Sequence, residues 1–275
     1  MLDELNKHKW ELLSKISNSD EGIGGQSKIE INEERKIIRK IYKKSETKHY
    51  YIEKDILKQL DHPNIIKLLE YDDSTLTLYF PYYPNGCAFN YYMVDEEINL
   101  SNEYDKLYRL FKDILNATHY LYKNNITHRD IKLENILIDS NGNHILSDFG
   151  LSINQIYKMR KSCGTYNYMS PELCYIGLDK TRKYDYKTDI FSLGALIIET
   201  GNGESLFYDE QRCRYKRVYR ELTEFYKKDI KIFKEHWTNT PELRTLLKKM
   251  INPTPIDRID YPDIFKELSI METTK

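Results

Sequence analysis

The sequence predicts an α+β fold with two unlike lobes: a small antiparallel β-sheet with one helix comes first, and a larger, mainly helical lobe follows. Two observations carry this prediction. Over residues 10–80 the apolar side chains form short, strand-like runs, with one stripe at helical spacing among them. Beyond residue 86 apolar side chains recur at helical spacing over long segments. Runs of strands followed by runs of helices are typical of α+β proteins.

The first lobe begins with a predicted hairpin. Apolar residues at 29–31 and 37–38 flank the polar stretch 32–35, which is the pattern of two antiparallel strands joined by a turn. Residues 52–60 carry the apolar stripe that predicts the helix, and residues 76–80 alternate as a further strand.

Three segments indicate the elements of the second lobe. Apolar residues at helical spacing over 107–121 predict a long amphipathic helix. Apolar residues at 136–138 and 145–146 flank an Asn-Gly turn, which predicts a second hairpin. Residues 189–198 are apolar nearly all round, so we expect a buried helix there.

The composition excludes several classes of partner. The 275 residues include 42 basic and 43 acidic side chains, so no global field points to nucleic acid or to a membrane surface. No apolar run approaches the roughly 20 residues that a membrane span needs. Four cysteines, at positions 87, 163, 174 and 213, show no metal-type spacing, as in proteins of reducing compartments. We expect a soluble protein of the cytoplasm or nucleus, of undetermined oligomeric state.

The densest chemical signal is one eight-residue string and a triplet that follows it. Asp148-Phe149-Gly150 begins thirteen residues after the end of the string His128-Arg129-Asp130-Ile131-Lys132-Leu133-Glu134-Asn135. Either motif alone is weak, because a lone Asp-Phe-Gly is usually a turn and a lone His-Arg-Asp a surface loop. Together, at this spacing, they resemble the signature of the eukaryotic protein kinase family. The resemblance implies one catalytic domain over 10–270 with a five-stranded sheet, comprising an N-terminal lobe (10–80), a hinge (81–86) and a C-terminal lobe (87–270).

The chemistry of phosphoryl transfer requires residues of these types. The reaction needs a hydroxyl aligned with the bond that breaks, and neutralised charge, but little covalent help. Asp130 can orient that hydroxyl and accept its proton, and Lys132 can meet the charge of the migrating phosphate. Asn135 and Asp148 offer the oxygen ligands that magnesium prefers. The resemblance therefore implies catalytic roles for Asp130, Lys132 and Asn135, metal roles for Asn135 and Asp148, and ATP with Mg²⁺ in the cleft.

The resemblance also implies a nucleotide site in the N-terminal lobe. Residues 22–29 fall at the place of a phosphate-covering glycine-rich loop, but Ser27 stands where the third glycine belongs, which puts tight closure of the loop in doubt. Lys40 matches the lysine that contacts the α/β-phosphates and Glu53 its partner, although the basic neighbours of Lys40 also fit a solvated face. The expected nucleotide-binding residues are Gly22, Gly24, Ser27, Ile29, Lys40, Glu53, Phe80, Pro81, Tyr83 and Asp148.

The expected hinge contacts follow from backbone chemistry. Proline lacks only the N–H, so Pro81 can accept a hydrogen bond from adenine, and Tyr83 can donate one. Phe80 is expected to close the back of the pocket.

Later motifs complete the resemblance. Residues 163–168 and 170–172 are similar to the G-T-x-x-Y and A-P-E strings that close a kinase activation segment. Asp189 matches the aspartate that holds the backbone of the catalytic loop. Arg258 matches the buried partner of Glu172, for which a plain surface ion pair is the alternative.

Lys132 and Thr165 indicate the acceptor, because this pair is typical of the Ser/Thr branch of the family. The sequence thus predicts a serine/threonine protein kinase that transfers the ATP γ-phosphoryl group to protein hydroxyls. Two alternatives stay open: a pseudokinase or nucleotide-binding scaffold, suggested by Ser27 and the altered residues before Lys40, and a small-molecule kinase of the same fold.

Two acidic residues indicate which substrates are preferred. Glu134 and Glu199 match positions that pair with a basic residue two before the acceptor, whereas Cys87 replaces an acidic residue used by other kinases that prefer basic peptides. We expect a moderate preference for basic peptides.

The activation segment lacks the usual switch residue. Arg129 matches the arginine that binds a phosphate on this segment in related kinases. Lys161, however, stands where relatives carry the phosphorylated threonine. No acidic residue between Leu151 and Lys161 can mimic a phosphate, and Ser162 is one residue out of register. We expect activity without phosphorylation of this segment, with Ser162 autophosphorylation as the rival.

Overall fold

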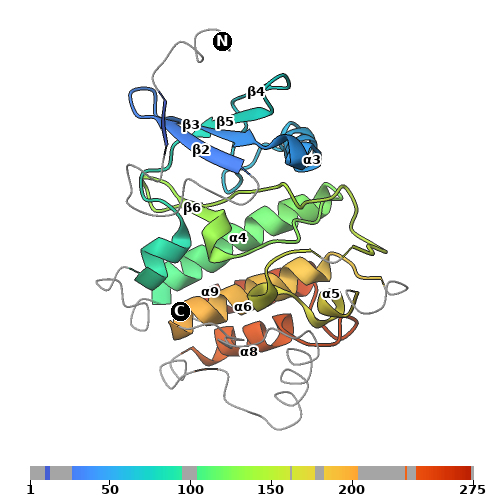
Figure 1. The fold of residues 1–275 in the computed structure, drawn as a ribbon. Coiled ribbons are helices and arrows are strands. Elements are labelled where there is room, and N and C mark those ends of the chain that lie inside the picture. The colour runs from blue at the N-terminus through green and yellow to red at the C-terminus, as the bar shows by residue number, and fades with distance from the viewer. Residues whose placement is uncertain are drawn as a thin grey trace.

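The computed structural model describes residues 10–12, 27–94, 104–161, 163–176, 183–203, 233 and 240–273. A sheet with one helix lies above a body of helices, as Figure 1 shows. The α+β prediction, with the sheet first in the chain and the helices after it, is confirmed.

The five described strands of the upper part form one antiparallel sheet in the order β1-β2-β3-β5-β4. They are β1 (Glu11–Leu12), β2 (Ser27–Asn32), β3 (Ile37–Tyr42), β4 (Glu70–Asp72) and β5 (Thr77–Pro81). The predicted hairpin is β2 with β3, in which Asn32 lies opposite Ile37 across the polar turn. The further strand is β5, shifted by one residue from the prediction, so that Pro81 ends a strand.

The register divides the side chains of the sheet between two faces. Ile29 of β2 lies opposite Lys40 of β3, which lies opposite Leu78 of β5, and directly paired residues point to the same side. Arg39 points to the other side, where its guanidinium lies 4.4 Å from the ring of Trp10 and its Nε donates to Glu30 at 2.7 Å. The strand alternation thus separates Lys40 from its basic neighbour.

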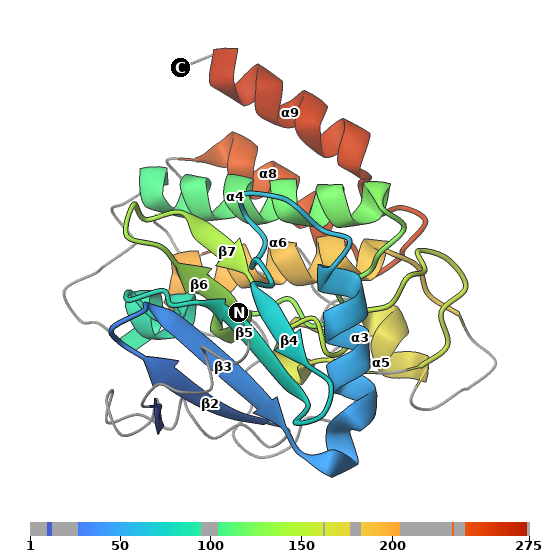
Figure 2. The same ribbon diagram turned by 90° about the horizontal axis from the view of Figure 1, so that it is seen from above.

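Helix α3 (Thr47–Leu57) stands beside the sheet, and Figure 2 shows it from above. A single turn of 3-10 helix, η1 (Lys44–Glu46), joins it to β3, so the connection is short. The helix ends at Leu57, three residues before the predicted end. The Lys54 ammonium and the Tyr50 hydroxyl both donate to Asp73 Oδ1, at 2.7 and 2.8 Å, which ties α3 to the β4–β5 turn.

Helices and a small hairpin form the lower part. The helices are η2 (Asn90–Val94), α4 (Tyr104–Lys123), η4 (Leu133–Asn135), η5 (Tyr166–Tyr168), α5 (Pro171–Ile176), α6 (Lys187–Asn202), α8 (Pro241–Met250) and α9 (Tyr261–Thr273). The hairpin pairs β6 (Ile136–Ile138) with β7 (His144–Leu146), as predicted. Its turn is held by the Asp139 carboxylate, which accepts from the backbone N–H groups of Asn141 and Asn143, both at 2.8 Å.

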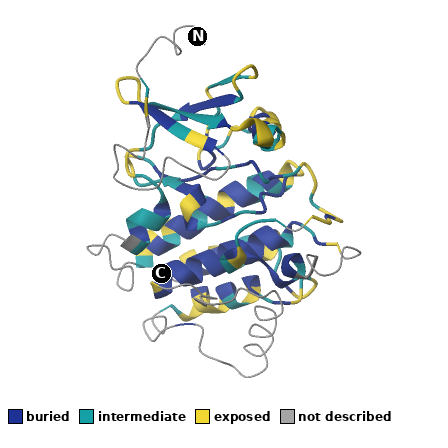
Figure 3. Cartoon of the chain, viewed as in Figure 1, coloured by how far each residue is buried: buried dark blue, intermediate teal, exposed yellow. Residues whose placement is uncertain are grey.

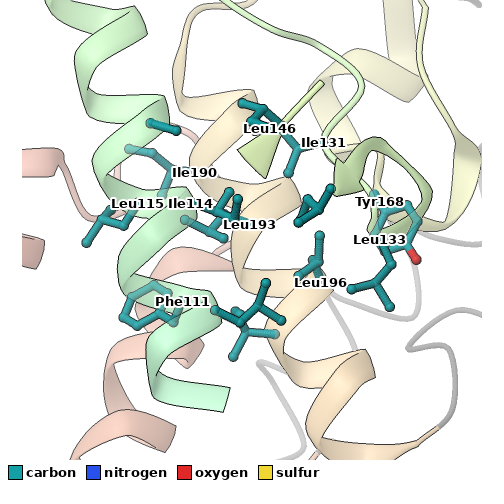
Figure 4. Packing of buried hydrophobic residues seen from close by; sticks show 14 of the residues in the cluster. Phe111, Ile114, Leu115, Ile131, Leu133, Leu146, Tyr168, Ile190, Leu193 and Leu196 are labelled. Atoms are coloured by element: carbon teal, nitrogen blue, oxygen red, sulfur yellow. The ribbon is translucent and has the colours of Figure 1, made fainter. Parts of the chain in front are cut away.

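The core of the lower part centres on α4 and α6. Every residue of α6 except Lys187 is buried, which confirms the helix expected to be apolar all round, and Figure 3 shows the burial along it. Side chains of α4 and α6 pack together with Ile131 and Leu133, both from the loop that carries Asp130 (Figure 4). Full burial of such a side chain typically contributes about 1.5–3 kcal/mol. The loop is therefore anchored in the core on both sides of Lys132.

Two further findings concern the helices. Gly194 allows α6 to approach the end of α8, because a Cβ there would lie 2.9 Å from the side chain of Ile251. Within the described residues, no helix is both long and apolar enough to cross a membrane.

Candidate active site

The first residue pair of the catalytic string is held by the buried helix α6. Asp189, in the first turn of α6, accepts hydrogen bonds from the backbone N–H groups of His128 at 2.7 Å and Arg129 at 2.9 Å. Burial raises the pKa of the Asp189 carboxyl, and these two N–H groups counteract that effect. Arg129 has a φ of +72°, a conformation uncommon for residues other than glycine. The buried carboxylate thus fixes a strained backbone directly before Asp130.

Three predicted side chains meet around the Asp130 carboxylate. Oδ1 accepts from Thr165 Oγ1 at 2.8 Å, and Oδ2 accepts from Asn135 Nδ2 at 3.1 Å. The Lys132 ammonium lies 3.5 Å from Oδ2 and donates to Thr165 Oγ1 at 3.1 Å. Asp130, Lys132, Asn135 and Thr165 therefore form one hydrogen-bonded group, although 33 residues separate Lys132 from Thr165.

Glycine is required beside this group. Gly164 has a φ of +104°, and a Cβ there would lie 2.4 Å from the carbonyl oxygen of Arg129. The backbone before Thr165 can approach the catalytic loop this closely only without a side chain.

Lys40 joins the two lobes through two carboxylates. Its ammonium lies 2.9 Å from Glu53 Oε2 on α3 and 2.9 Å from Asp148 Oδ1. Burial opposes the charge of Lys40, but Asp148 and Glu53 outweigh it and raise the Lys40 pKa well above its usual value. Burial likewise opposes ionisation of Asp148, yet the positive charge of Lys40 lowers its pKa. Lys40 and Asp148 are therefore both charged at neutral pH.

Glu53 also positions the Asp148-Phe149-Gly150 triplet. Its Oε1 accepts from the backbone N–H of Phe149 at 3.0 Å. The Phe149 ring is fully buried, and its edge contacts the ring of His128 at a centroid distance of 4.8 Å. Asp148 has a φ of +58°, a conformation that is uncommon for residues other than glycine. Such a conformation persists only where the surrounding structure maintains it. One carboxylate of α3 thus holds both β3 and the triplet.

A tyrosine that the motifs do not include completes this cluster. The Tyr42 hydroxyl donates to Glu53 Oε2, and the Lys40 ammonium lies 4.9 Å from the centre of the Tyr42 ring. Strand alternation could have predicted that Tyr42 lies near Lys40, since Tyr42 is two residues after Lys40 and must share its face of the sheet.

The oxygen atoms near the triplet fit a magnesium ion. Asn135 uses its Nδ2 for the carbonyl and carboxylate of Asp130, so its Oδ1 is the atom suited to a metal. The side chain of Asp148 is 43% exposed and uses Oδ1 for Lys40, which leaves Oδ2 for the same ion. Magnesium is commonly held by one or two carboxylates together with substrate phosphates, so two protein oxygens suit it.

The other predicted nucleotide residues lie on the sheet and at its end. Ser27 lies opposite Tyr42, and Ile29 lies opposite Lys40, so both share the Lys40 face. Phe80 is buried and lies on the same face through its pairing with Ile38. Gly22 and Gly24, the first two glycines of the expected phosphate loop, lie outside the described residues.

The hinge geometry leaves two backbone groups for a ligand. The Tyr42 N–H donates to the Leu76 carbonyl, and the Tyr82 N–H donates to the Lys36 carbonyl. These two bonds show which residue pairs along β3 and β5 are hydrogen-bonded, since hydrogen-bonded and non-hydrogen-bonded pairs alternate in an antiparallel ladder. Pro81 therefore occupies a non-hydrogen-bonded position opposite Ile37, where its carbonyl points away from β3. Among the described residues, the Tyr83 N–H donates no hydrogen bond.

The pair expected at the end of the activation segment is buried. Arg258 Nη1 and Nη2 lie 2.6 and 2.9 Å from the two carboxylate oxygens of Glu172. The Arg258 side chain is fully buried and also donates to the carbonyls of Asn252 and Lys187. The surface-pair alternative is therefore wrong. Buried pairs matter because losing one partner typically costs about 3–5 kcal/mol.

The two acidic residues assigned to substrate selection differ in burial. Glu134 is exposed, whereas Glu199, near the end of α6, is buried and hydrogen-bonded to Tyr168. Burial, with a smaller effect of the Glu134 charge, raises the pKa of Glu199 to about 7. The ionisation of Glu199 therefore changes within the physiological pH range.

Comparison with known proteins shows the family to which the chain belongs. A family model described as "Protein kinase domain" matches residues 27–268. The chain is 33% identical over 236 residues to an Aurora kinase of Saccharomyces cerevisiae. The matched region covers 82% of this chain and 59% of that protein. It is 32% identical over 225 residues to MARK-C of Dictyostelium discoideum, a probable serine/threonine-protein kinase, covering 77% of this chain and 28% of that protein.

A third relative is CBL-interacting serine/threonine-protein kinase 12 of Arabidopsis thaliana, which is 32% identical over 227 residues, 79% of this chain and 42% of that protein. The chain thus spans less than two thirds of the length of each of these three relatives.

Proposed function

Because the chain belongs to the protein kinase domain family, we propose that it is an ATP-dependent serine/threonine kinase that phosphorylates proteins. The observation that carries the proposal is the group around Asp130. A carboxylate that is oriented by Thr165 and Asn135, with the Lys132 ammonium 3.5 Å away, is placed to receive a hydroxyl proton beside a source of positive charge.

The proposed reaction moves one phosphoryl group and one proton. The acceptor hydroxyl oxygen forms a bond to the γ-phosphorus, while the bond from that phosphorus to the β–γ bridging oxygen breaks. ADP leaves with the bond electrons, and the hydroxyl proton passes to Asp130. Lys132 offsets charge on the phosphoryl oxygens, and Thr165 keeps both side chains in place.

The roles of Lys40, Glu53, Asp148 and Asn135 concern the nucleotide. We assign the α/β-phosphates to the Lys40 ammonium, which Glu53 holds in position. Asn135 and Asp148 would hold magnesium, which would supply positive charge to neutralise the phosphates. We assign adenine to the Pro81 carbonyl and the Tyr83 N–H, with Phe80 behind it. The role of the loop with Gly22 and Gly24 over the phosphates stays a prediction, as do the contacts of Ser27 and Ile29.

The two alternative functions are separated by one assay. ADP production is followed with ATP and magnesium, first with mixed protein acceptors and then with mixed metabolites. We expect turnover that depends on protein. Nucleotide binding without turnover would favour a scaffold, and turnover with metabolites alone would favour a small-molecule kinase. Neither the Lys40–Glu53 ion pair nor the complete Asp130 group gives a reason to prefer the scaffold.

We expect the enzyme in the cytoplasm or nucleus. Cys87, Cys163 and Cys174 carry thiols rather than disulfides, as is usual for proteins of reducing compartments.

We propose a preference for basic residues two positions before the acceptor, and we expect this preference to depend on pH. Glu199, with a pKa of about 7, is charged above neutral pH and largely neutral below it. About a tenth of the group is ionised one pH unit below its pKa and about nine tenths one unit above. The ratio of kcat/KM for an Arg peptide to that for an Ala peptide should therefore rise several-fold from pH 6 to pH 8.

The ratio is informative because effects of pH on Asp130 or on ATP act on both peptides and cancel. Glu199→Gln is the matched control and should give a ratio that does not change over this range. A wild-type ratio equal at pH 6 and pH 8 would remove Glu199 from the proposed subsite. Arg should exceed Lys as the preferred basic residue, since paired carboxylates favour the guanidinium fork.

We also propose activity without phosphorylation of the activation segment. Lys158, Arg160 and Lys161 are exposed, so water can screen their charges. Ser162 lies outside the described residues. Phosphatase-treated enzyme with an intact mass free of phosphate should retain most of its initial rate, and Ser162→Ala should do the same. Loss of most activity in both would favour the rival, Ser162 autophosphorylation.

A further inference from the structure

Arg129, which precedes the catalytic aspartate, is buried against uncharged oxygen atoms. Its Nε donates to the carbonyl of Leu151 at 2.8 Å, and its Nη2 donates to the same carbonyl. Its Nη1 donates to the hydroxyl of Tyr184 at 3.2 Å. Within the described residues Arg129 forms no ion pair with a carboxylate, and only 7% of it is exposed. The buried guanidinium thus donates to a carbonyl and a phenol.

The Tyr184 hydroxyl connects Arg129 to the activation segment. It accepts from Arg129 and donates its own proton to the carbonyl oxygen of Lys161 at 2.8 Å. Burial raises the pKa of Tyr184 to about 12, so the hydroxyl keeps that proton at physiological pH. A phenol can accept and donate at once, and here it does both.

The backbone and ring of Tyr184 reinforce this connection. Its N–H and carbonyl exchange hydrogen bonds of 3.0 and 2.9 Å with the carbonyl and N–H of Met159. The ring is 4% exposed and belongs to a separate apolar cluster with Met159, Met169, Leu173 and Cys174. Tyr184 thus holds the segment at two positions, residues 159 and 161.

We propose that Tyr184 is a positioning residue that fastens the activation segment to the catalytic loop. The inference rests on the proposed function. Its consequence reaches the reacting group through the chain, because Lys161 is four residues before Thr165, which donates to Asp130. Gly164, between them, lies against the carbonyl of Arg129. Loosening the segment at residue 161 therefore releases Thr165 from Asp130.

Tyr184→Phe isolates the hydroxyl, because it keeps the ring in the apolar cluster and the backbone bonds to Met159. The variant leaves the Lys161 carbonyl and one Arg129 N–H without this partner, and losing a buried hydrogen bond to a charged group is costly. We expect kcat/KM for a peptide to fall about tenfold, with the affinity for ATP within about twofold of wild type. ATP affinity is spared because Lys40, Glu53 and the hinge are untouched.

A second readout follows the segment itself. Lys158, Arg160 and Lys161 are exposed trypsin sites, and cleavage there reports local opening of the segment. We expect Tyr184→Phe to be cleaved after these residues about tenfold faster than wild type, as measured by intact mass over time. Tyr157→Phe is the matched control, since Tyr157 is 52% exposed in the same segment, and it should behave as wild type.

Cleavage and kcat/KM both within twofold of wild type in Tyr184→Phe would overturn the inference. The cleavage comparison does not require activity, so a wild-type protein without transferase activity would overturn the proposed function alone. If Tyr184→Phe yields too little folded protein, Arg129→Gln removes the other partner of the same hydroxyl and should also speed cleavage at these sites. Unchanged cleavage in Arg129→Gln would count equally against the inference.

Discussion

Asp130→Asn should lower kcat by on the order of 10²-fold or more while the affinity for ATP with magnesium stays within about twofold of wild type. The substitution keeps an oxygen that can accept from Thr165, and Asp189 still holds the backbone directly before residue 130. It removes the carboxylate that orients the acceptor hydroxyl and takes its proton. Nucleotide affinity is spared because Lys40, Glu53 and Asp148 form their cluster without direct contact with Asp130.

The measurement is the initial rate of peptide phosphorylation together with nucleotide binding by titration calorimetry. Asp263→Asn on α9 is the matched control, because Asp263 is exposed and lies in the lower helical part of the molecule. It should leave both quantities unchanged. Turnover of Asp130→Asn within a few-fold of wild type would refute the assignment of Asp130.

Asp148→Asn should weaken the binding of ATP by about tenfold or more, but only when magnesium is present. The ion loses a charged ligand, whereas Lys40 keeps the carboxylate of Glu53, which holds its ammonium with or without magnesium. The activity should fall further than the affinity does, because phosphate charge is poorly neutralised in the transition state.

Binding is measured with a fluorescent ATP analogue, with magnesium and then with a chelator. Without magnesium, wild type and Asp148→Asn should bind the analogue with similar affinity, so each protein serves as its own control. If the variant retained the full gain in affinity that magnesium gives to wild type, Asp148 would not be a metal ligand.

The parts of this architecture that sequence predicts are those set by local periodicity or by motif spacing. The motif singled out Lys40 rather than Arg39, and the β2–β3 register places these two side chains on opposite faces of the sheet. The fully apolar pattern of α6 identified a buried helix, with Asp189 near its start. The predicted ends of elements differ from the observed ones: α3 stops before Leu60, and β5 includes Pro81. The reason is that contacts at its ends, rather than periodicity, determine where an element stops.

Partners brought together by the tertiary fold could not be predicted in the same way. Tyr184 is 55 residues from Arg129 in the chain, and nothing in its neighbourhood marks it as the acceptor of that guanidinium. Tyr42 could have been placed on the Lys40 face by alternation, but its hydrogen bond depends on how α3 packs. The loop with Gly22 and Gly24, and Ser162, lie outside the described residues, so the predictions about them are untested.

The proposed transfer to serine and threonine is tested by identifying the phosphorylated amino acid. Purified enzyme is incubated with magnesium and ATP labelled at the γ-phosphate, and with three peptides that differ only in having serine, threonine or tyrosine as the single acceptor. We expect label on serine and threonine, at least tenfold less on tyrosine, and a rate lower by on the order of 10²-fold or more with Asp130→Asn. Label on tyrosine alone, or no label on any peptide from an enzyme that binds ATP, would contradict the proposal.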